Sequence, residues 1–421
     1  MLDTVRSCGC DDTSVLAGLM SISDARNRAL SLVSPLIGGE TLALAQALGR
    51  ILSYAVSAPA AMPFFSNSAM DGFAVQSTDF AGDGPWVLPE AGTVSAGRAR
   101  GGTLTAGQVA RIFTGAPIPE NCDSVVMVEK TRETPEGILF HNRPRPGDNI
   151  RLQGSDLAQG QNLVKAGTRL APHHIGLLAA NGIEAVSVVR RPRVAVFSTG
   201  DEITETGRGA GQIFDANRPM LIALANAMGA DVQDCGILPD DLDNSARRLA
   251  EIAGDVDMIL TSGAVSMGGR DFLRPALEAA GGTIDAWRVA MKPGKPVMFG
   301  ALSGCIVTGL PGNPMAALIG FHVFVQPQLR KMCGQPARTF AAYSATAGFS
   351  WKRKPGRDEV FPVRLSGNTL TGQPELQRLG QGVSATLLPV ADADGLAIIP
   401  GQTVEVSPGD PLMWQPFSKE I

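Results

Sequence analysis

The chain has 421 residues, and a typical domain size of about 100–200 residues predicts about three or four domains. Its 36 Lys and Arg nearly balance its 40 Asp and Glu, so no basic surface for nucleic acid is expected. Hydrophobic residues make up 44% of the chain, but no apolar run approaches the roughly 20 residues that span a bilayer. A membrane protein is therefore not expected.

The amino end and the cysteines favour the cytoplasm. Residues 1–18 carry three aspartates and lack both the basic and the apolar region of a secretory signal. The six cysteines show no regular spacing, which is typical of reduced thiols in the cytosol. Cys8 and Cys10 lack the second pair or neighbouring histidine that a soft-metal site needs. We expect a cytoplasmic protein with free thiols.

Helical segments flank a different kind of sequence in the first 190 residues. Residues 20–56 are expected to be helical from an N-cap at Ser21 or Ser23, with a second apolar-periodic helix over residues 41–52. Another helix is expected over residues 170–181, where a glycine closes it.

The segment between these helices changes in composition. Residues 58–155 are rich in Gly, Pro, Val and Thr, and they contain strand-like runs over residues 108–113 and 124–128. Since helices precede and follow this segment, we expect a β-rich insertion that projects from a helical base.

Strands and helices alternate regularly from residue 193 to about residue 335. This alternation is typical of a doubly wound α/β domain, in which helices connect parallel strands. Strands are expected over residues 193–198, 231–237 and 257–262 and near 297–299 and 305–308, and helices over residues 216–229, 241–253, 271–280 and 314–332.

Short strands and turns return after Pro336, where Gly367-Asn368 suits a tight hairpin. This segment is typical of a β-barrel or sandwich. We therefore expect a multidomain α/β protein: a discontinuous helical base (20–57 and 157–190), an inserted β-rich domain (58–156), an α/β domain (191–335) and a C-terminal β-barrel domain (336–421).

Four polar loops of the α/β region, in residues 194–202, 259–271, 291–296 and 309–314, are predicted to form one anion-binding face. The first, second and fourth follow short apolar, β-branched runs that suit buried parallel strands, so they should open at the carboxyl edge of one sheet. Glycines let the backbone approach a ligand, while hydroxyls and lysines supply hydrogen bonds and positive charge. The candidate binding residues are Ser262, Gly263, Ser266, Lys292, Lys295, Pro311, Gly312, Asn313 and Pro314.

These loops match neither Gly-x-Gly-x-x-Gly nor the Walker pattern, so neither dinucleotide binding nor P-loop hydrolysis follows. The rigid turn Pro293-Gly294 would hold Lys292 and Lys295 towards one point, although a lone lysine usually extends into solvent. Glu202 and the preceding Asp201 can ligate Mg²⁺ at a strand end. The alternative for these acids is an acidic helix N-cap.

Polar residues of the β-rich insertion have a functional and a structural interpretation. Asp71 lies in a loop with two aromatic and three small polar residues, which indicates either a ligand loop or an Asx-capped turn. Thr114 follows an expected strand, either as an exposed hydroxyl or in a plain turn. Arg151 stands between Asp148 and Asp156, where a surface ion pair would contribute only about 0–1 kcal/mol.

Seven motifs stand in a fixed order along the chain. They are Ser68-Ala-Met-Asp-Gly72, Thr114-Gly-Ala-Pro117, Asn149-Ile-Arg-Leu-Gln-Gly-Ser-Asp156, Phe197-Ser-Thr-Gly-Asp-Glu202, Ser262-Gly-Ala-Val-Ser266, Lys292-Pro-Gly-Lys-Pro296 and Pro311-Gly-Asn-Pro314. With these motifs the chain resembles the molybdopterin molybdenumtransferases, a MoeA-like family that includes the carboxyl-terminal domain of gephyrin. The similarity extends over residues 20–416.

The resemblance implies insertion of molybdate into adenylylated molybdopterin, with Mg²⁺-dependent loss of AMP, to give molybdenum cofactor. It implies a homodimer whose active sites lie between the α/β domain of one subunit and the β-rich insertion of the other. It also implies transient contacts with the molybdopterin adenylyltransferase and with acceptor molybdoenzymes. The catalytic residues it implies are Asp71, Thr114, Asp156, Glu202 and Asp271, with Glu202 and Asp271 as metal ligands and Lys292 and Lys295 beside them.

Some positions depart from the family pattern. Ala264 replaces the second glycine of the Ser-Gly-Gly loop, and Phe73 replaces a common tyrosine. Leu388-Pro389 stands where a Ser-Ser pair is frequent, which leaves a contact from Ser384 open.

Two rival functions belong to other classes. The α/β region is similar to the domain that adenylylates molybdopterin, so a nucleotidyltransferase is one rival. A non-catalytic scaffold is the other, because the homologous domain of gephyrin also binds receptor tails. The intact acids and lysines argue against a pure scaffold, and the β-rich insertion favours molybdate insertion over adenylylation.

Overall fold

The computed structural model describes residues 18–97, 103–207, 209–263, 272–336, 338–370, 372–382 and 385–417, without the side chains of residues 286 and 287. The chain divides into two compact units. We call them the sheet unit (Met1–Glu40, Gly49–Ser53 and Val188–Ile421) and the insert unit (Thr41–Leu48 and Tyr54–Ser187). The boundaries of the four expected domains stay a prediction.

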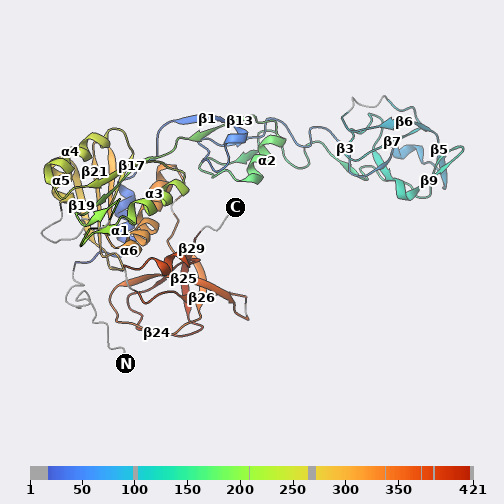
Figure 1. The fold of residues 1–421 in the computed structure, drawn as a ribbon. Coiled ribbons are helices and arrows are strands. Elements are labelled where there is room, and N and C mark those ends of the chain that lie inside the picture. The colour runs from blue at the N-terminus through green and yellow to red at the C-terminus, as the bar shows by residue number, and fades with distance from the viewer. Residues whose placement is uncertain are drawn as a thin grey trace. The chain divides into compact units, whose positions relative to one another are not determined.

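A six-stranded mixed sheet forms the core of the α/β part of the sheet unit (Figure 1). The first four strands in spatial order run parallel, whereas the two remaining pairings are antiparallel. In spatial order the strands are β17 (Asp231–Leu238), β14 (Arg193–Thr199), β18 (Met258–Ser262), β22 (Cys305–Leu310), β21 (Pro296–Leu302) and β19 (Thr283–Arg288).

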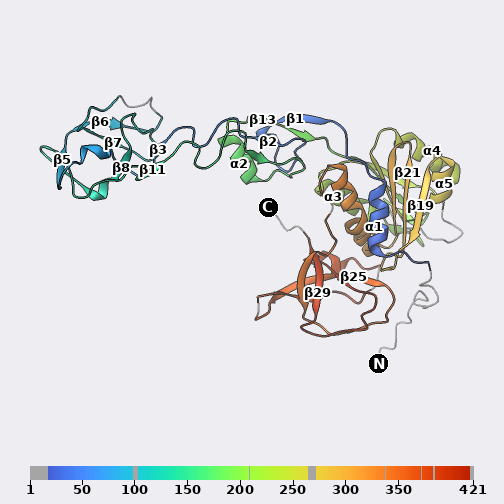
Figure 2. The same cartoon turned by 180° about the vertical axis from the view of Figure 1, so that it is seen from behind.

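Helices cover both faces of this sheet, as Figures 1 and 2 show from opposite sides. Alternate residues of a strand point to opposite faces, so Val194 and Val196 enter one core while Ala195 and Phe197 enter the other. This arrangement confirms the expected α/β fold. One face carries α4 (Leu242–Ala253) and α5 (Leu273–Ala279), and the other carries α1 (Ile22–Ser31), α3 (Asn217–Ala227), α6 (Pro314–Gly320), the π-helical turn Phe321–Val325 and α7 (Gln326–Met332).

The expected C-terminal β-barrel is confirmed. Its five strands close because the last strand in spatial order also pairs with the first. The barrel strands are β25 (Asp358–Asn368), β26 (Pro374–Arg378), β23 (Tyr343–Ala347), β29 (Pro411–Pro416) and β27 (Gly395–Ile399). The short strand β20 (Met291–Lys292) pairs with β25, and β24 (Trp351–Lys352) pairs with β28 (Glu405–Val406). The helix α8 (Leu388–Ala391) precedes β27.

The predicted hairpin turn at Gly367-Asn368 is wrong, because both residues still belong to β25 and Asn368 pairs with Pro374. The chain leaves the strand at Thr369 instead. There the backbone N–H of Thr369 donates to the carbonyl of Gln373 (2.8 Å), and the N–H of Gln373 donates to the Thr369 hydroxyl (3.1 Å).

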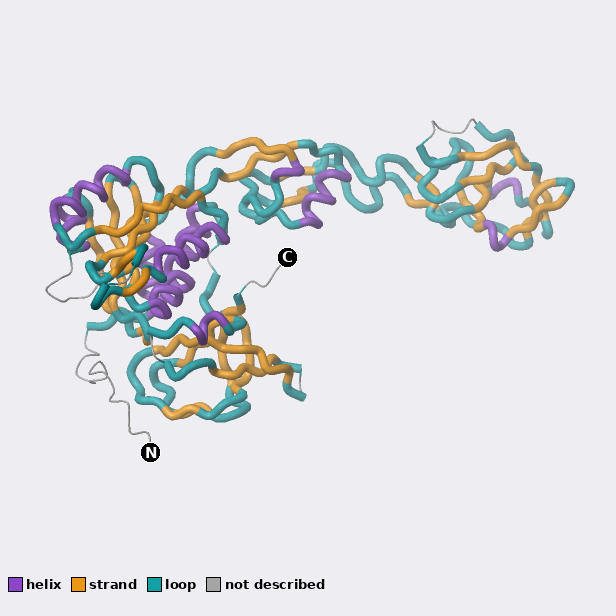
Figure 3. Tube along the Cα trace, in the orientation of Figure 1, coloured by secondary structure: helices purple, strands orange, loops and turns teal. Residues whose placement is uncertain are grey.

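The insert unit consists mainly of strands and loops, as Figure 3 shows. A four-stranded sheet (β6-β7-β4-β8) and a three-stranded sheet (β5-β10-β9) form its β-rich part. The strands are β2 (Val56–Ser57), β3 (Asn67–Ser68), β4 (Gly72–Val75), β5 (Trp86–Leu88), β6 (Glu90–Val94), β7 (Val109–Ile112), β8 (Ser124–Met127), β9 (Thr131–Thr134), β10 (Gly137–Phe140), β11 (Ile150–Arg151) and β12 (Asn162–Val164), with 3₁₀ turns at Ser77–Asp79 and Val128–Lys130.

The predicted helices of the base are only partly correct. Ser21 caps α1 as predicted, and α2 (Pro172–Ala180) forms within its expected range. The helix expected over residues 41–52 is wrong: β1 (Gly39–Ala43) and a 3₁₀ turn at Leu44–Gln46 replace it. β1 pairs with β13 (Ala185–Val189), a partner remote in sequence. No helix within the described ranges is long and apolar enough to cross a membrane.

Candidate functional site

The described parts of the four predicted loops lie at one edge of the six-stranded sheet. Ser198 pairs with Ser262, and Ser262 pairs with Leu310, so the carboxyl ends of β14, β18 and β22 lie side by side. The antiparallel strand β21 starts at this same edge, because Met298 pairs with Gly309. The turn over residues 291–296 therefore reaches the edge from the opposite chain direction. We call this the sheet edge.

Ser262 connects the strands below the sheet edge. Its side chain is buried, and its hydroxyl donates to the carbonyl of Pro311 (3.2 Å). The amide of Asn217 donates both to this hydroxyl (2.7 Å) and to the carbonyl of Gly312 (2.7 Å). Since the single hydroxyl proton is already donated to protein, Ser262 shapes the two loops more than it offers a hydrogen bond to a ligand.

One of the two loop glycines, Gly263, is required by close packing. Gly263 has a φ of +98°, and a Cβ there would lie 2.5 Å from the carbonyl oxygen of Thr199. A Cβ on Gly312 would lie 3.6 Å from the Cα of Gly263. Gly312 and Asn313 are exposed, and the N-cap Asn313 is followed by Pro314 at the start of α6. An exposed helix start of this kind presents N–H groups suited to an anion.

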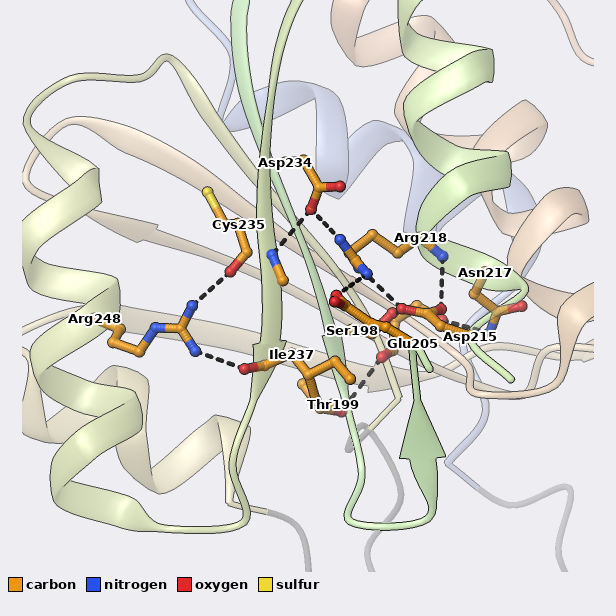
Figure 4. A network of polar contacts seen from close by, with 12 residues as sticks. Ser198, Thr199, Glu205, Asp215, Asn217, Arg218, Asp234, Cys235, Ile237 and Arg248 are labelled. Atoms are coloured by element: carbon orange, nitrogen blue, oxygen red, sulfur yellow. Dashed lines mark hydrogen bonds and ion pairs between the residues drawn. The ribbon is translucent and has the colours of Figure 1, made fainter. Parts of the chain in front are cut away.

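A polar network beside the sheet edge was not predicted (Figure 4). Arg218, whose side chain is 8% exposed, donates from Nε to Asp215 (2.9 Å) and contacts Asp234 and Glu205 with its terminal nitrogens. Asp215 also accepts the Ser198 hydroxyl (2.9 Å). Burial opposes the charge on Arg218, but the bonds to Asp215 and Asp234 still hold its pKa above the ordinary value.

This network fixes the start of α3 to the end of β14. The sequence does contain a signal for this network. Residues 215–219 place polar residues directly before a helix start that contains a proline, and the predicted site in residues 311–314 has the same pattern. The role of Asn217 as a link between the loops after β18 and β22 could not be seen in the sequence.

Glu202 is an exposed carboxylate just beyond the end of β14. A Cβ on Gly200, whose φ is +131°, would lie 2.6 Å from Glu202 Oε1, so the carboxylate folds back over this glycine. The helix-cap alternative for Glu202 is wrong, because β15 (Ile203–Thr204), which pairs with β16 (Ile213–Phe214), follows it.

Two of the predicted residues, Ser266 and Asp271, lie outside the described residues. Across the described part of the chain, no group of three or more His, Cys, Asp and Glu is placed to hold a metal ion. Mg²⁺ commonly binds through one or two carboxylates together with substrate phosphates, so Glu202 fits a ligand set that the substrate completes.

The two lysines of the turn over residues 291–296 are half-buried. Lys292 Nζ lies 3.5 Å from Oε1 of Glu359, a residue of the barrel that is only 3% exposed. The carbonyl of Lys295 accepts the backbone N–H of Val289 (2.8 Å). Lys292 is thus paired with a protein carboxylate, which the sequence did not predict.

Asp71 and Thr114 contact each other in the insert unit. Asp71 Oδ1 accepts both the backbone N–H (2.8 Å) and the hydroxyl (2.7 Å) of Thr114. The backbone bond and then the side-chain bond lower the pKa of Asp71. A Cβ on the next residue, Gly72, would lie 2.0 Å from the carbonyl oxygen of Val126, so only glycine lets β4 start at this position.

The loop that carries Asp156 lies beside the loop that carries Asp71. The backbone N–H of Gly154 donates to the carbonyl of Pro63 (3.1 Å), and β11 pairs with β3. Asp156 is exposed. The ion-pair alternative is wrong, because within the described residues Arg151 pairs with neither Asp148 nor Asp156.

Exposed apolar side chains occur in the same loops of the insert unit. We call this group the apolar rim. Its members are between 39% and 60% exposed: Phe64, Phe65, Met70, Phe113 and Leu152.

Comparison with known proteins decides the family. The chain is 34% identical over 404 residues to the molybdopterin molybdenumtransferase of Haemophilus influenzae, with 95% of this chain and 99% of that protein covered. The chain belongs to the MoeA family. It is also 36% identical to molybdopterin molybdenumtransferase 2 of Mycobacterium tuberculosis, with 88% of this chain and 93% of that protein covered.

Three family models match successive parts of this MoeA-family chain. The MoeA N-terminal region (domain I and II) matches residues 20–182, a probable molybdopterin binding domain matches residues 195–331, and the MoeA C-terminal region (domain IV) matches residues 344–417. The crystal structure of a MoeA protein from Pyrococcus horikoshii is similar at a TM-score of 0.80 and 29% identity, and it covers 96% of this chain and 100% of that chain. The sheet edge therefore falls in the molybdopterin-binding match, and Asp71, Thr114 and Asp156 fall in the N-terminal match.

Proposed function

We propose that this MoeA-family chain is a molybdopterin molybdenumtransferase that inserts molybdate into adenylylated molybdopterin and releases AMP. The observation that carries the proposal is the 34% identity to the Haemophilus influenzae enzyme over nearly its whole length. The sheet edge supports it, because the exposed Gly312 before α6 and the two half-buried lysines suit several oxyanions in one place.

The sheet edge is proposed to hold the pterin substrate and molybdate. The backbone around Gly263 and Gly312, the start of α6 at residues 313–314 and Ser266 would bind phosphate oxygens. Lys292 and Lys295 would offset the charge of the molybdate dianion. Glu202 and Asp271 would hold Mg²⁺, which supplies positive charge to the pyrophosphate when it is bound.

The insert unit is proposed to complete the site of a partner subunit. Asp71, kept ionised by its bonds to Thr114, and the nearby Asp156 provide carboxylates for this face. The apolar rim around them supports coverage by another protein surface, because exposed clusters of apolar side chains commonly mark contact sites. We therefore propose a homodimer with shared active sites.

A direct assay separates this function from its rivals. Purified protein is incubated with adenylylated molybdopterin, Mg²⁺ and molybdate, and AMP is measured. We expect AMP only when all three components are present. A second incubation contains ATP, Mg²⁺ and molybdopterin, and pyrophosphate release there would instead identify an adenylyltransferase. The absence of both products from folded protein would favour a scaffold.

A further inference from the structure

The turn that carries Lys292 is built against the C-terminal barrel. β20 pairs in parallel with β25, where Met291 is opposite Asp358 and Lys292 is opposite Glu359. The backbone N–H of Asp358 donates to the carbonyl of Ala290 (2.9 Å). Residues 290–292 are thus aligned along a barrel strand, and the barrel fixes their backbone.

Glu359 is the buried charge in this contact. It accepts Arg353 Nε at 3.0 Å, and the side chains of both residues are only 4% exposed. Arg353 also donates to the carbonyls of Pro400 (2.8 Å) and Thr403 (2.6 Å), so its guanidinium cannot move without breaking bonds to the barrel. A buried carboxylate persists only when it is paired, and Arg353 therefore fixes the position of Glu359.

Lys292 approaches the other oxygen of the same carboxylate. Its Nζ lies 3.5 Å from Glu359 Oε1, whereas Arg353 occupies Oε2. The Lys292 side chain is still 39% exposed, and an ammonium has three donors. One side of the ammonium can therefore face the carboxylate while the remaining donors face outward.

We propose that Glu359 is a positioning residue that holds the Lys292 ammonium at the sheet edge, so that the C-terminal barrel takes part in oxyanion binding. This inference rests on the proposed function of Lys292. Without the carboxylate, the long and flexible lysine side chain would sample many rotamers and would meet molybdate in one of them only part of the time. The alternative role predicts the opposite effect. If Glu359 only neutralised the charge of Lys292, removing the charge of Glu359 would strengthen anion binding.

A double-mutant cycle distinguishes these effects. The parent, Glu359→Gln, Lys292→Ala and the double variant are compared by the molybdate concentration that half-saturates AMP release, and separately by the KM for adenylylated molybdopterin. We expect Glu359→Gln to raise the molybdate value at least about threefold, as for coupled residues in contact, and to leave the pterin KM nearly unchanged. In the Lys292→Ala background, Glu359→Gln should not raise the half-saturating molybdate concentration further.

A control and a second variant complete the cycle. Glu405→Gln removes the carboxylate of an exposed barrel pair with Lys352 and should leave the molybdate value unchanged. Glu359→Asp keeps the charge beside Arg353 but is shorter, so it should raise the molybdate value even if Glu359→Gln does not fold. An unchanged or lower molybdate value in a folded Glu359 variant, or an equal effect without Lys292, would overturn the proposal.

A chemical measurement tests the pairing without any turnover. Lysines of folded protein are acetylated briefly with acetic anhydride, and the labelling of Lys292 relative to Lys352 is measured by mass spectrometry. We expect Lys292 to be labelled severalfold faster in Glu359→Gln than in the parent, because the carboxylate no longer holds it. Unchanged labelling overturns the positioning role, whereas a parent that labels as expected but releases no AMP overturns only the proposed function.

Discussion

Asp71 combines exposure with a fixed geometry. One of its oxygens accepts two hydrogen bonds from Thr114, and within the described part of the chain the other accepts none. The turn thus orients a carboxylate outward and keeps it ionised, as a group that contacts a substrate or a metal requires.

Asp71→Asn tests the charge of this residue and preserves the acceptor for Thr114. We expect AMP release to fall by about 100-fold, which is a typical effect of removing one acid–base group. Asp148→Asn is the matched control, because Asp148 is an exposed carboxylate of the same unit that accepts the backbone N–H of Arg145 (2.9 Å). Equal turnover in the Asp71 and Asp148 variants would show that Asp71 only caps its turn.

At the residue scale, local patterns identified the loops but not their long-range partners. The loop of Asp71 was recognisable because its polar residues fit no helix or strand period. The Glu359 partner of Lys292 was not recognisable, because the two residues meet only when the barrel packs beside the sheet edge. Asn217 was missed because its partners, Ser262 and Gly312, are also remote from it in sequence.

At the element scale, buried charged side chains hold the start of α3 in place. Arg218 connects it to Asp215, whose side chain is 3% exposed, and to two further carboxylates. The apolar pattern of β14 and α3 predicts where these elements lie, but the ion network fixes how the helix begins.

Arg218→Met should destabilise the sheet unit by about 3–5 kcal/mol, because it leaves a buried carboxylate without its cation. Arg247→Met is the matched control: Arg247 pairs with Glu251 on the exposed side of α4, where loss of a pair costs about 0.3–0.5 kcal/mol. Urea unfolding of both variants provides the comparison. Similar free energies of unfolding for the two variants would contradict the role of the network.

The wrong helix over residues 41–52 has a physical cause in a remote strand. Residues 41–52 have a helix-like apolar spacing, yet β1 forms because its backbone pairs with β13. The backbone N–H of Leu44 likewise donates to the carbonyl of Glu184 (2.8 Å). A partner so remote in sequence overrides local propensity. In the α/β region, the predicted strands pair within the six-stranded sheet and are confirmed, whereas β19 and β20 were not predicted.

At the scale of the whole molecule, the proposed catalytic residues are divided between two compact units. Asp71, Thr114 and Asp156 belong to the insert unit, and Glu202 and the two lysines belong to the sheet unit. We propose that these two faces act as one active site, with each face supplied by a different subunit of a homodimer.

A verified heterodimer of an Asp71→Asn chain and a Glu202→Ala chain tests this claim most directly. One of its two sites would carry both substitutions, and the other would carry none. We therefore expect about half of the parental AMP release per dimer, although each variant homodimer is nearly inactive. If the heterodimer is as inactive as the two homodimers, each site is built within one subunit and the claim is contradicted.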